Sequence, residues 1–196
     1  MSTDLTFIID LEIQKLIEDF EKYPDKYLTE SDVRCFLVEK LVKQPEFSRF
    51  QKTEDGSESI SLHTEIRWYG KSNKNVRYDI VIIDVSSLIV KDGAFKIPEL
   101  PSKGFGFDTP LAIIEIKLRR VNDKSAFIEK INNDIKKLTD IKEEIDAEYP
   151  SYLVVLDKKR NIEEKLRKLI PQSTGIKLFY KSQPSNKTKS KKPGAN

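Results

Sequence analysis

The feature that most restricts the fold is the apolar run PLAIIEIKL at residues 110–118, which lacks the apolar–polar alternation of a half-exposed strand. A run of this kind is typical of a strand buried on both faces of a sheet. SYLVVLD at 151–157 has the same character. Between the two, residues 125–148 carry isoleucines and a leucine at helical spacing, which predicts a long amphipathic helix. Together these segments indicate a layered α/β domain.

Helical and strand patterns occupy most of the remaining chain. Apolar residues predict a first helix over 5–22, and Thr29 is a favourable N-cap for a second helix that ends near Lys43. The turn sequence GKSNKN separates the alternating residues 59–69 from an apolar strand at 76–85, which predicts a hairpin. The last expected elements are a short helix over 162–170 and a strand over 175–181.

This order of elements predicts one α/β domain over residues 1–182, with a mixed central β-sheet flanked by helices. A chain of 196 residues is long enough for one domain with a substantial core. Residues 1–24 contain the N-terminal helix, and residues 86–109 form a long irregular insert. Residues 183–196 combine Lys, Pro, Ser, Asn and Gly without an apolar anchor, so we expect a disordered tail.

The positive charge of the chain belongs to this tail. The full chain has 35 basic and 32 acidic residues, a net charge of +3. The tail holds four lysines and no acid, so the rest has 31 basic and 32 acidic residues, a net charge of −1. Charge alone therefore gives little indication of nucleic-acid binding. The tail is either a solubilising terminus or a weak arm for phosphate groups.

Cysteine and histidine content limits the chemistry. Cys35 is the single cysteine, so an internal disulfide is excluded, as is usual in a reducing compartment. With His63 as the single histidine, a structural zinc site is nearly excluded. The first residues lack a secretory signal, and no apolar run approaches the roughly 20 residues of a membrane span. We therefore expect a cytoplasmic protein.

Two charges interrupt the apolar run at 110–118. Glu115 and Lys117 are two residues apart, so in a strand they point to the same face as Ile113. A buried carboxylate costs several kcal/mol unless it is paired or bound to a metal. A buried Glu–Lys pair often gives no net stability over apolar residues. The pair therefore indicates either a function or a position at the open end of the strand.

Asp79 is a second charged residue at the start of an apolar strand, in YDIVIID. If Asp79 and Glu115 share one face of neighbouring strands, their carboxylates repel and one takes up a proton. A divalent cation would relieve this repulsion. Hard oxygen ligands favour Mg²⁺, with Mn²⁺ as a substitute, rather than zinc.

An Asp on one strand followed by Glu-x-Lys on the next resembles the active-site signature of the PD-(D/E)xK nuclease superfamily. Asp79 corresponds to its first aspartate, and Glu115 and Lys117 to its E-x-K, although Tyr78 stands where the signature has proline. The resemblance implies a restriction endonuclease-like three-layer core, with a mixed central β-sheet flanked by helices.

Many members of the superfamily place a further glutamate on the helix before the hairpin, for which Glu30 and Glu39 are candidates. At about 100° per residue, Leu37 and Leu41 fall within roughly 20° of Glu30, on the stripe that faces the core. Glu39 lies about 180° away, among solvent-facing positions. We therefore choose Glu30, although an acid is also favoured there by the helix dipole alone.

The resemblance implies metal-assisted hydrolysis of a phosphodiester. Asp79, Glu115 and the carbonyl of Ile116 would hold Mg²⁺, and Glu30 would help to hold a second ion. Lys117 would orient the attacking water or offset charge on the phosphate.

Other charged and aromatic residues have two readings each. Arg119 and Arg120 follow the Glu-x-Lys strand and either hold flanking phosphates or form a solvated strand end. Glu65 could join the site, but its strand reads more simply as surface. The charged residues of the helix over 125–148, including Asp134 and Lys137, indicate a solvent-facing side. Phe105 and Phe107 in the insert either stack on bases or pack on the core.

The sequence therefore predicts a Mg²⁺-dependent nuclease that acts on DNA, preferably as an endonuclease. Members of the superfamily often dimerise to cut two strands, so a homodimer is one arrangement that the resemblance allows. We expect neither a membrane partner nor a nucleotide cofactor. One alternative is a catalytically silent nuclease-like subunit that binds nucleic acid or joins an assembly. Another is a protein-interaction domain with a fortuitous ion pair.

Overall fold

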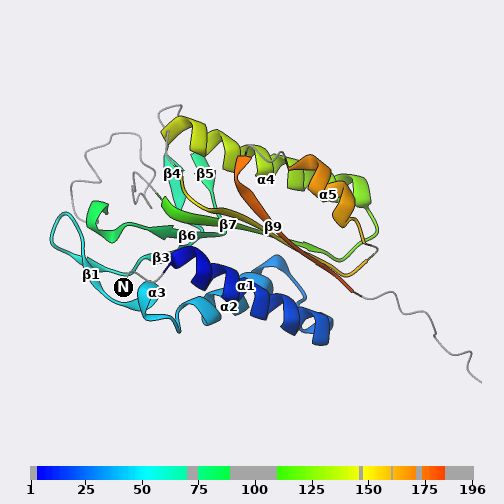
Figure 1. The fold of residues 1–196 in the computed structure, drawn as a ribbon, viewed down its shortest axis with the longest axis horizontal. Coiled ribbons are helices and arrows are strands. Elements are labelled where there is room, and N and C mark those ends of the chain that lie inside the picture. Colours follow the sequence, from blue (N-terminus) through cyan, green and yellow to red (C-terminus); the bar gives the residue numbers. More distant parts are fainter. Residues whose placement is uncertain are drawn as a thin grey trace, which may run out of the picture.

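The computed structural model describes residues 4–69, 75–88, 110–145, 148–159, 161–170 and 174–183. It has an α/β fold with a mixed five-stranded sheet in the order β3-β6-β7-β8-β9 (Figure 1). β3, β6 and β7 are antiparallel, whereas β7, β8 and β9 are parallel, which confirms the predicted mixed sheet. The strands are β3 (Leu62–Thr64), β6 (Ile80–Ile83), β7 (Pro110–Arg119), β8 (Ser151–Asp157) and β9 (Ile176–Ser182).

Helices cover both faces of this sheet (Figure 1). On one face lie α1 (Leu5–Lys22) and α2 (Glu30–Leu41), and on the other lie α4 (Lys124–Ile145) and α5 (Glu163–Leu169). The buried side chains form two clusters, one for each face. Along β7, Ile114 and Ile116 belong to the cluster with α1 and α2, and Ile113 to the cluster with α4 and α5. This alternation confirms that Glu115 and Lys117 are on the α4 side of the strand.

Several short elements were not expected from the sequence. They are the 3₁₀ turns η1 (Pro24–Lys26) and η2 (Val85–Ser87), the one-turn helix α3 (Pro45–Ser48), and the paired strands β1 (Gln51–Lys52) and β2 (Glu58–Ser59). Pro45 occupies the first position of α3, where its missing N–H is not needed. Over the described ranges, no helix combines the length and the apolar character required to cross a bilayer.

The predicted hairpin exists but is divided into two parts. β3 pairs with β6 in the main sheet, whereas β4 (Arg67–Tyr69) pairs with β5 (Asn75–Arg77) in a separate two-stranded sheet. Glu65 lies at the break and has a φ of 53°, in the left-handed region that non-glycine residues rarely adopt. Its backbone N–H still donates to the carbonyl of Asp79. The break redirects the hairpin just before β6 begins.

The division of the hairpin opens the main sheet beside β7. Pairing between β6 and β7 runs from Pro110 to Ile114 on the β7 side, but β7 itself continues to Arg119. Two backbone N–H groups beyond this point, those of Ile116 and Leu118, donate to side-chain carboxylates instead of to a strand. Because buried backbone donors are nearly always paired, this open stretch needs side-chain acceptors, and Asp79 and Glu30 supply them.

Candidate active site

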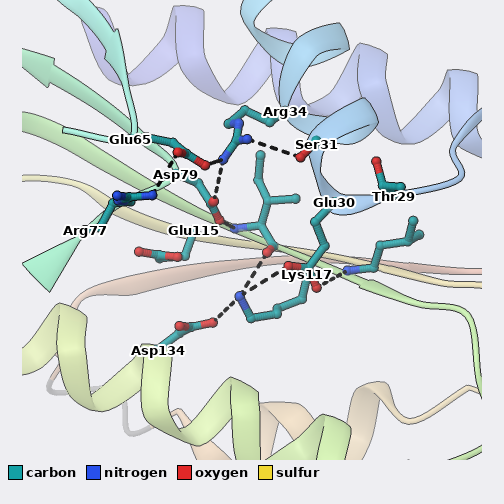
Figure 2. A network of polar contacts seen from close by, with 12 residues as sticks. Thr29, Glu30, Ser31, Arg34, Glu65, Arg77, Asp79, Glu115, Lys117 and Asp134 are labelled. Carbon is teal, nitrogen blue, oxygen red and sulfur yellow. Dashed lines mark hydrogen bonds and ion pairs between the residues drawn. The ribbon is translucent and has the colours of Figure 1, made fainter. Parts of the chain in front are cut away.

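The four residues predicted to form the site lie together at this opening of the sheet (Figure 2). Asp79 directly precedes β6, and its Oδ2 accepts a hydrogen bond of 2.8 Å from the N–H of Ile116. Glu30 is the first residue of α2, and its Oε1 accepts a bond of 3.4 Å from the N–H of Leu118. Both carboxylates thus contact the strand that carries Glu115 and Lys117.

A complete capping box fixes the position of Glu30. The Thr29 hydroxyl accepts a hydrogen bond of 3.1 Å from the N–H of Asp32, and the Asp32 carboxylate accepts one of 2.8 Å from the N–H of Thr29. α2 therefore starts at a defined residue. The Glu30 side chain is 45% exposed, and its Oε2 lies 3.9 Å from the Nζ of Lys117.

Glu115 is the most deeply buried acid of the site, with 2% of its surface exposed. Burial raises its pKa to about 8, and the charges of Asp79 and Asp134 act in the same direction, whereas the Lys137 ammonium opposes them. Lys137 Nζ lies 2.5 Å from Glu115 Oε1. This oxygen nevertheless makes no well-directed hydrogen bond to any described group. It remains a suitable ligand for a cation.

Lys117 carries the ammonium of the site. Its Nζ lies 2.7 Å from Asp134 Oδ2 and donates a hydrogen bond of 3.1 Å to the carbonyl of Ile116. Burial lowers the pKa of Lys117, but the nearby carboxylates, led by Asp134, outweigh burial and hold the pKa above its usual value. Lys117 is therefore a permanent cation at neutral pH.

Asp134 and Lys137 of α4 belong to the site, so the expectation that they face solvent was wrong. Asp134 is 8% exposed, and Lys137 donates to the carbonyl of Arg77 as well as pairing with Glu115. The sequence held a signal for Asp134, which follows Ile131 by three residues and precedes Leu138 by four. Residues at this spacing share one helix face, and that face packs on the sheet.

Arg34 of α2 is another residue that the sequence analysis missed. It donates hydrogen bonds to Asp79 Oδ1 at 3.2 Å and to Glu65 Oε1 at 2.5 Å, and Arg77 contacts the other oxygen of Glu65 at 3.1 Å (Figure 2). Glu65, which the sequence favoured as plain surface, thus joins the network through Arg34. No sequence pattern pointed to Arg34, because its partners come from distant segments.

The two arginines after β7 differ from each other. Arg119 is 3% exposed, and its guanidinium makes hydrogen bonds of 2.8 and 2.7 Å to the two oxygens of Asp157, which is fully buried. Both readings of Arg119, as a phosphate contact and as a solvated strand end, were therefore wrong. Arg120 is exposed and donates to the carbonyl of Leu28. Phe105, Phe107 and the tail lysines lie outside the described residues.

The donor groups fit a hard cation. Asp79, Glu115 and Glu30 offer carboxylates and Ile116 offers a carbonyl, and Mg²⁺ prefers such oxygens and keeps several waters. Among the described residues, no three His, Cys, Asp or Glu side chains are grouped closely enough to form a metal site of side chains alone. A set of two carboxylates would therefore have to be completed by the Ile116 carbonyl, which also accepts a hydrogen bond from Lys117.

The charges of the site nearly balance without a metal. Its carboxylates exceed its cationic side chains by one if all are counted as ionised. The carboxylates are those of Glu30, Glu65, Asp79, Glu115 and Asp134, and the cations are Arg34, Arg77, Lys117 and Lys137. A cation that binds here must therefore compete with Arg34 and Lys137 for oxygens.

Comparison with known proteins gives no independent identification: no family model, no curated protein and no solved structure matches this chain.

Proposed function

We propose that this chain is a Mg²⁺-dependent nuclease that hydrolyses DNA phosphodiester bonds, with a restriction endonuclease-like core. The observation that carries the proposal is the buried Glu115 carboxylate on the same strand face as Lys117, where the sheet opens toward Asp79. Plain packing gives no reason for these charges, because apolar residues would be at least as stable there.

The order of elements also supports the proposal. A helix with Glu30 precedes the β3–β6 pair, which is followed by the Glu-x-Lys strand β7, the helix α4 and the parallel strand β8. The same order is similar to that of the PD-(D/E)xK superfamily. The site residues come from four of these elements, α2, β6, β7 and α4, or from positions next to them.

Each residue has a role that follows from its contacts. Asp79, Glu115 and the Ile116 carbonyl would hold Mg²⁺, and Glu30, on the exposed side, would support a second ion. Bound Mg²⁺ would supply Lewis-acid stabilisation of the phosphate charge and a water of lowered pKa. The Lys117 ammonium, next to the Ile116 carbonyl, would orient the attacking water or offset charge on the phosphate.

The test is incubation of the full chain with supercoiled plasmid, linear duplex and single-stranded DNA, in Mg²⁺ and in EDTA. We expect cleavage in Mg²⁺ only, and a loss of at least about 100-fold in Asp79→Ala and Lys117→Ala. Glu39→Gln is the matched control, because Glu39 is exposed on the far side of α2 and should leave cleavage unchanged. Cleavage that survives in both site variants would exclude this site.

A second candidate function, a nuclease-like module that binds nucleic acid without cutting, is favoured by one observation. Lys137 and Arg34 already neutralise Glu115 and Asp79. Each of these two acids therefore has a cationic partner without a metal. Metal-independent DNA binding without cleavage in the same experiment would support this module.

A further inference from the structure

The strand alone does not hold the Lys117 ammonium in place. A lysine side chain carries about 2 kcal/mol of rotamer entropy, and its charge can reach several partners. Asp134 of α4 provides its shortest ion pair, at 2.7 Å, with both side chains only 12% exposed. Glu30 is farther away, at 3.9 Å, and much more exposed. Asp134 is therefore the main partner that fixes Lys117 (Figure 2).

Asp134 also directs Lys117 away from Glu115. These two β7 side chains are on the same face of the strand, so Lys117 could otherwise pair with Glu115 and neutralise a metal ligand. Asp134 attracts Lys117 and also lies 3.6 Å from Lys137, between two ammonium groups. Asp134 thus has two lysine neighbours, whereas Glu115 has one, although neither Asp134 Oδ2 nor Glu115 Oε1 makes a well-directed hydrogen bond to a described group.

We propose that Asp134 is a positioning residue, which holds the Lys117 ammonium beside the Ile116 carbonyl and is not itself a metal ligand. This inference rests on the proposed nuclease function. It gives α4 a part in placing the Lys117 ammonium. A supporting residue of this kind typically contributes about 10–100-fold to activity.

The experiment compares Asp134→Asn, Lys117→Met and the double variant on whichever DNA the wild type cleaves, over a range of Mg²⁺ concentrations. We expect Asp134→Asn to lower kcat about 10–100-fold without changing the Mg²⁺ concentration for half-maximal rate. In the Lys117→Met background the same substitution should have no further effect, because it acts through Lys117. Glu143→Gln, on the exposed side of α4, is the matched control and should behave as wild type.

Each result decides between distinct explanations. A rise of tenfold or more in the Mg²⁺ requirement of Asp134→Asn would make Asp134 a metal ligand and overturn the inference. Wild-type rates in Asp134→Asn, or full additivity with Lys117→Met, would also overturn it. A wild type that cuts no DNA would instead overturn the proposed function. If Asp134→Asn unfolds, Asp134→Glu keeps the charge but shifts it by one methylene, and should fold with a reduced kcat.

Discussion

At the scale of single residues, Glu115 shows a conflict between stability and chemistry. Its carboxylate is almost fully buried, and of the described cationic side chains only Lys137 is close enough to offset its charge by direct contact. Burial outweighs this partner, because the pKa of Glu115 rises to about 8. The Glu115 carboxylate therefore lowers the free energy of unfolding of the metal-free protein, as charged groups in active sites often do.

This conflict predicts that Glu115→Gln is more stable than the wild type in EDTA at pH 8. Between the ordinary value of 4.5 and about 8, the folded carboxyl keeps a proton that the unfolded chain releases, so the free energy of unfolding falls as pH rises. Glutamine does not titrate, so the substitution removes this pH dependence of the free energy of unfolding. We expect a gain of about 1–2 kcal/mol at pH 8 and little difference near pH 4.5, measured by urea unfolding.

Magnesium supplies the control for this prediction. It should raise the stability of the wild type but not that of Glu115→Gln, because a ligand that binds only the folded state stabilises it. Glu129→Gln, an exposed substitution on α4, should change neither value. A variant less stable than wild type at pH 8 would mean that the Lys137 ion pair outweighs burial.

The sequence predicted those site residues whose position follows from the periodicity of their own strand or helix. Strand periodicity was enough to place Glu115 and Lys117 on one face, and helix geometry was enough to prefer Glu30 to Glu39. Arg34 and Lys137 were not predicted as site residues, because long cationic side chains on helices usually face solvent and their partners depend on tertiary packing. Arg119 was misread for the same reason, since nothing near it in sequence indicates Asp157.

At the scale of elements, the N-terminus of α2 sets the distance between Glu30 and β7. Thr29 was predicted as the N-cap, and in the structure it forms a complete capping box with Asp32. The division of the hairpin was not predicted, because a left-handed φ at Glu65 has no sequence signal when the residue is not glycine. Regular periodicity thus predicted the long helices and strands. The position of the sheet opening instead coincides with the left-handed φ of Glu65, which periodicity does not predict.

Thr29→Ala should loosen this start of α2. We expect a loss of about 1 kcal/mol, a decrease of about 2–4 °C in Tm, and slower DNA cleavage because Glu30 is less well placed. Thermal unfolding followed by circular dichroism and the plasmid assay measure the two effects. Thr29→Ser retains the hydroxyl and should restore both, whereas equal losses in both variants would show that the cap does not act through this oxygen.

At the scale of the whole molecule, two groups of buried charges differ in their surroundings. The pair of Arg119 and Asp157 is sealed under the sheet's α4 side and joins β7 to β8. The network around Glu115 lies where the sheet opens and retains an exposed acid in Glu30. The buried Arg119–Asp157 pair fits a purely structural role. The network around Glu115 fits a site that a cation from solvent could enter.

The tail lysines add charge to the chain, and the described residues of the site lie between 30 and 137. A chain ending at Gln183 loses four lysines and changes from a net charge of +3 to −1. We expect kcat at saturating DNA to be unchanged, and binding at low salt to weaken with a smaller salt dependence, by up to about 0.9 in log–log slope for each lost phosphate contact. Filter binding over a salt series measures this slope, and a lost kcat would assign the tail a direct part in cleavage.

The opening beside β7 also affects how such a protein would change over many generations. Asp79 and Glu30 satisfy the amides of Ile116 and Leu118, so the architecture itself selects for both acids whether or not catalysis survives. Among the described residues, no backbone N–H depends on Lys117 in this way. The Lys117 ammonium donates to the Ile116 carbonyl, so its loss would leave no backbone N–H without an acceptor. A lineage that gave up cutting would therefore lose its lysine first, and its acids would persist as part of the framework.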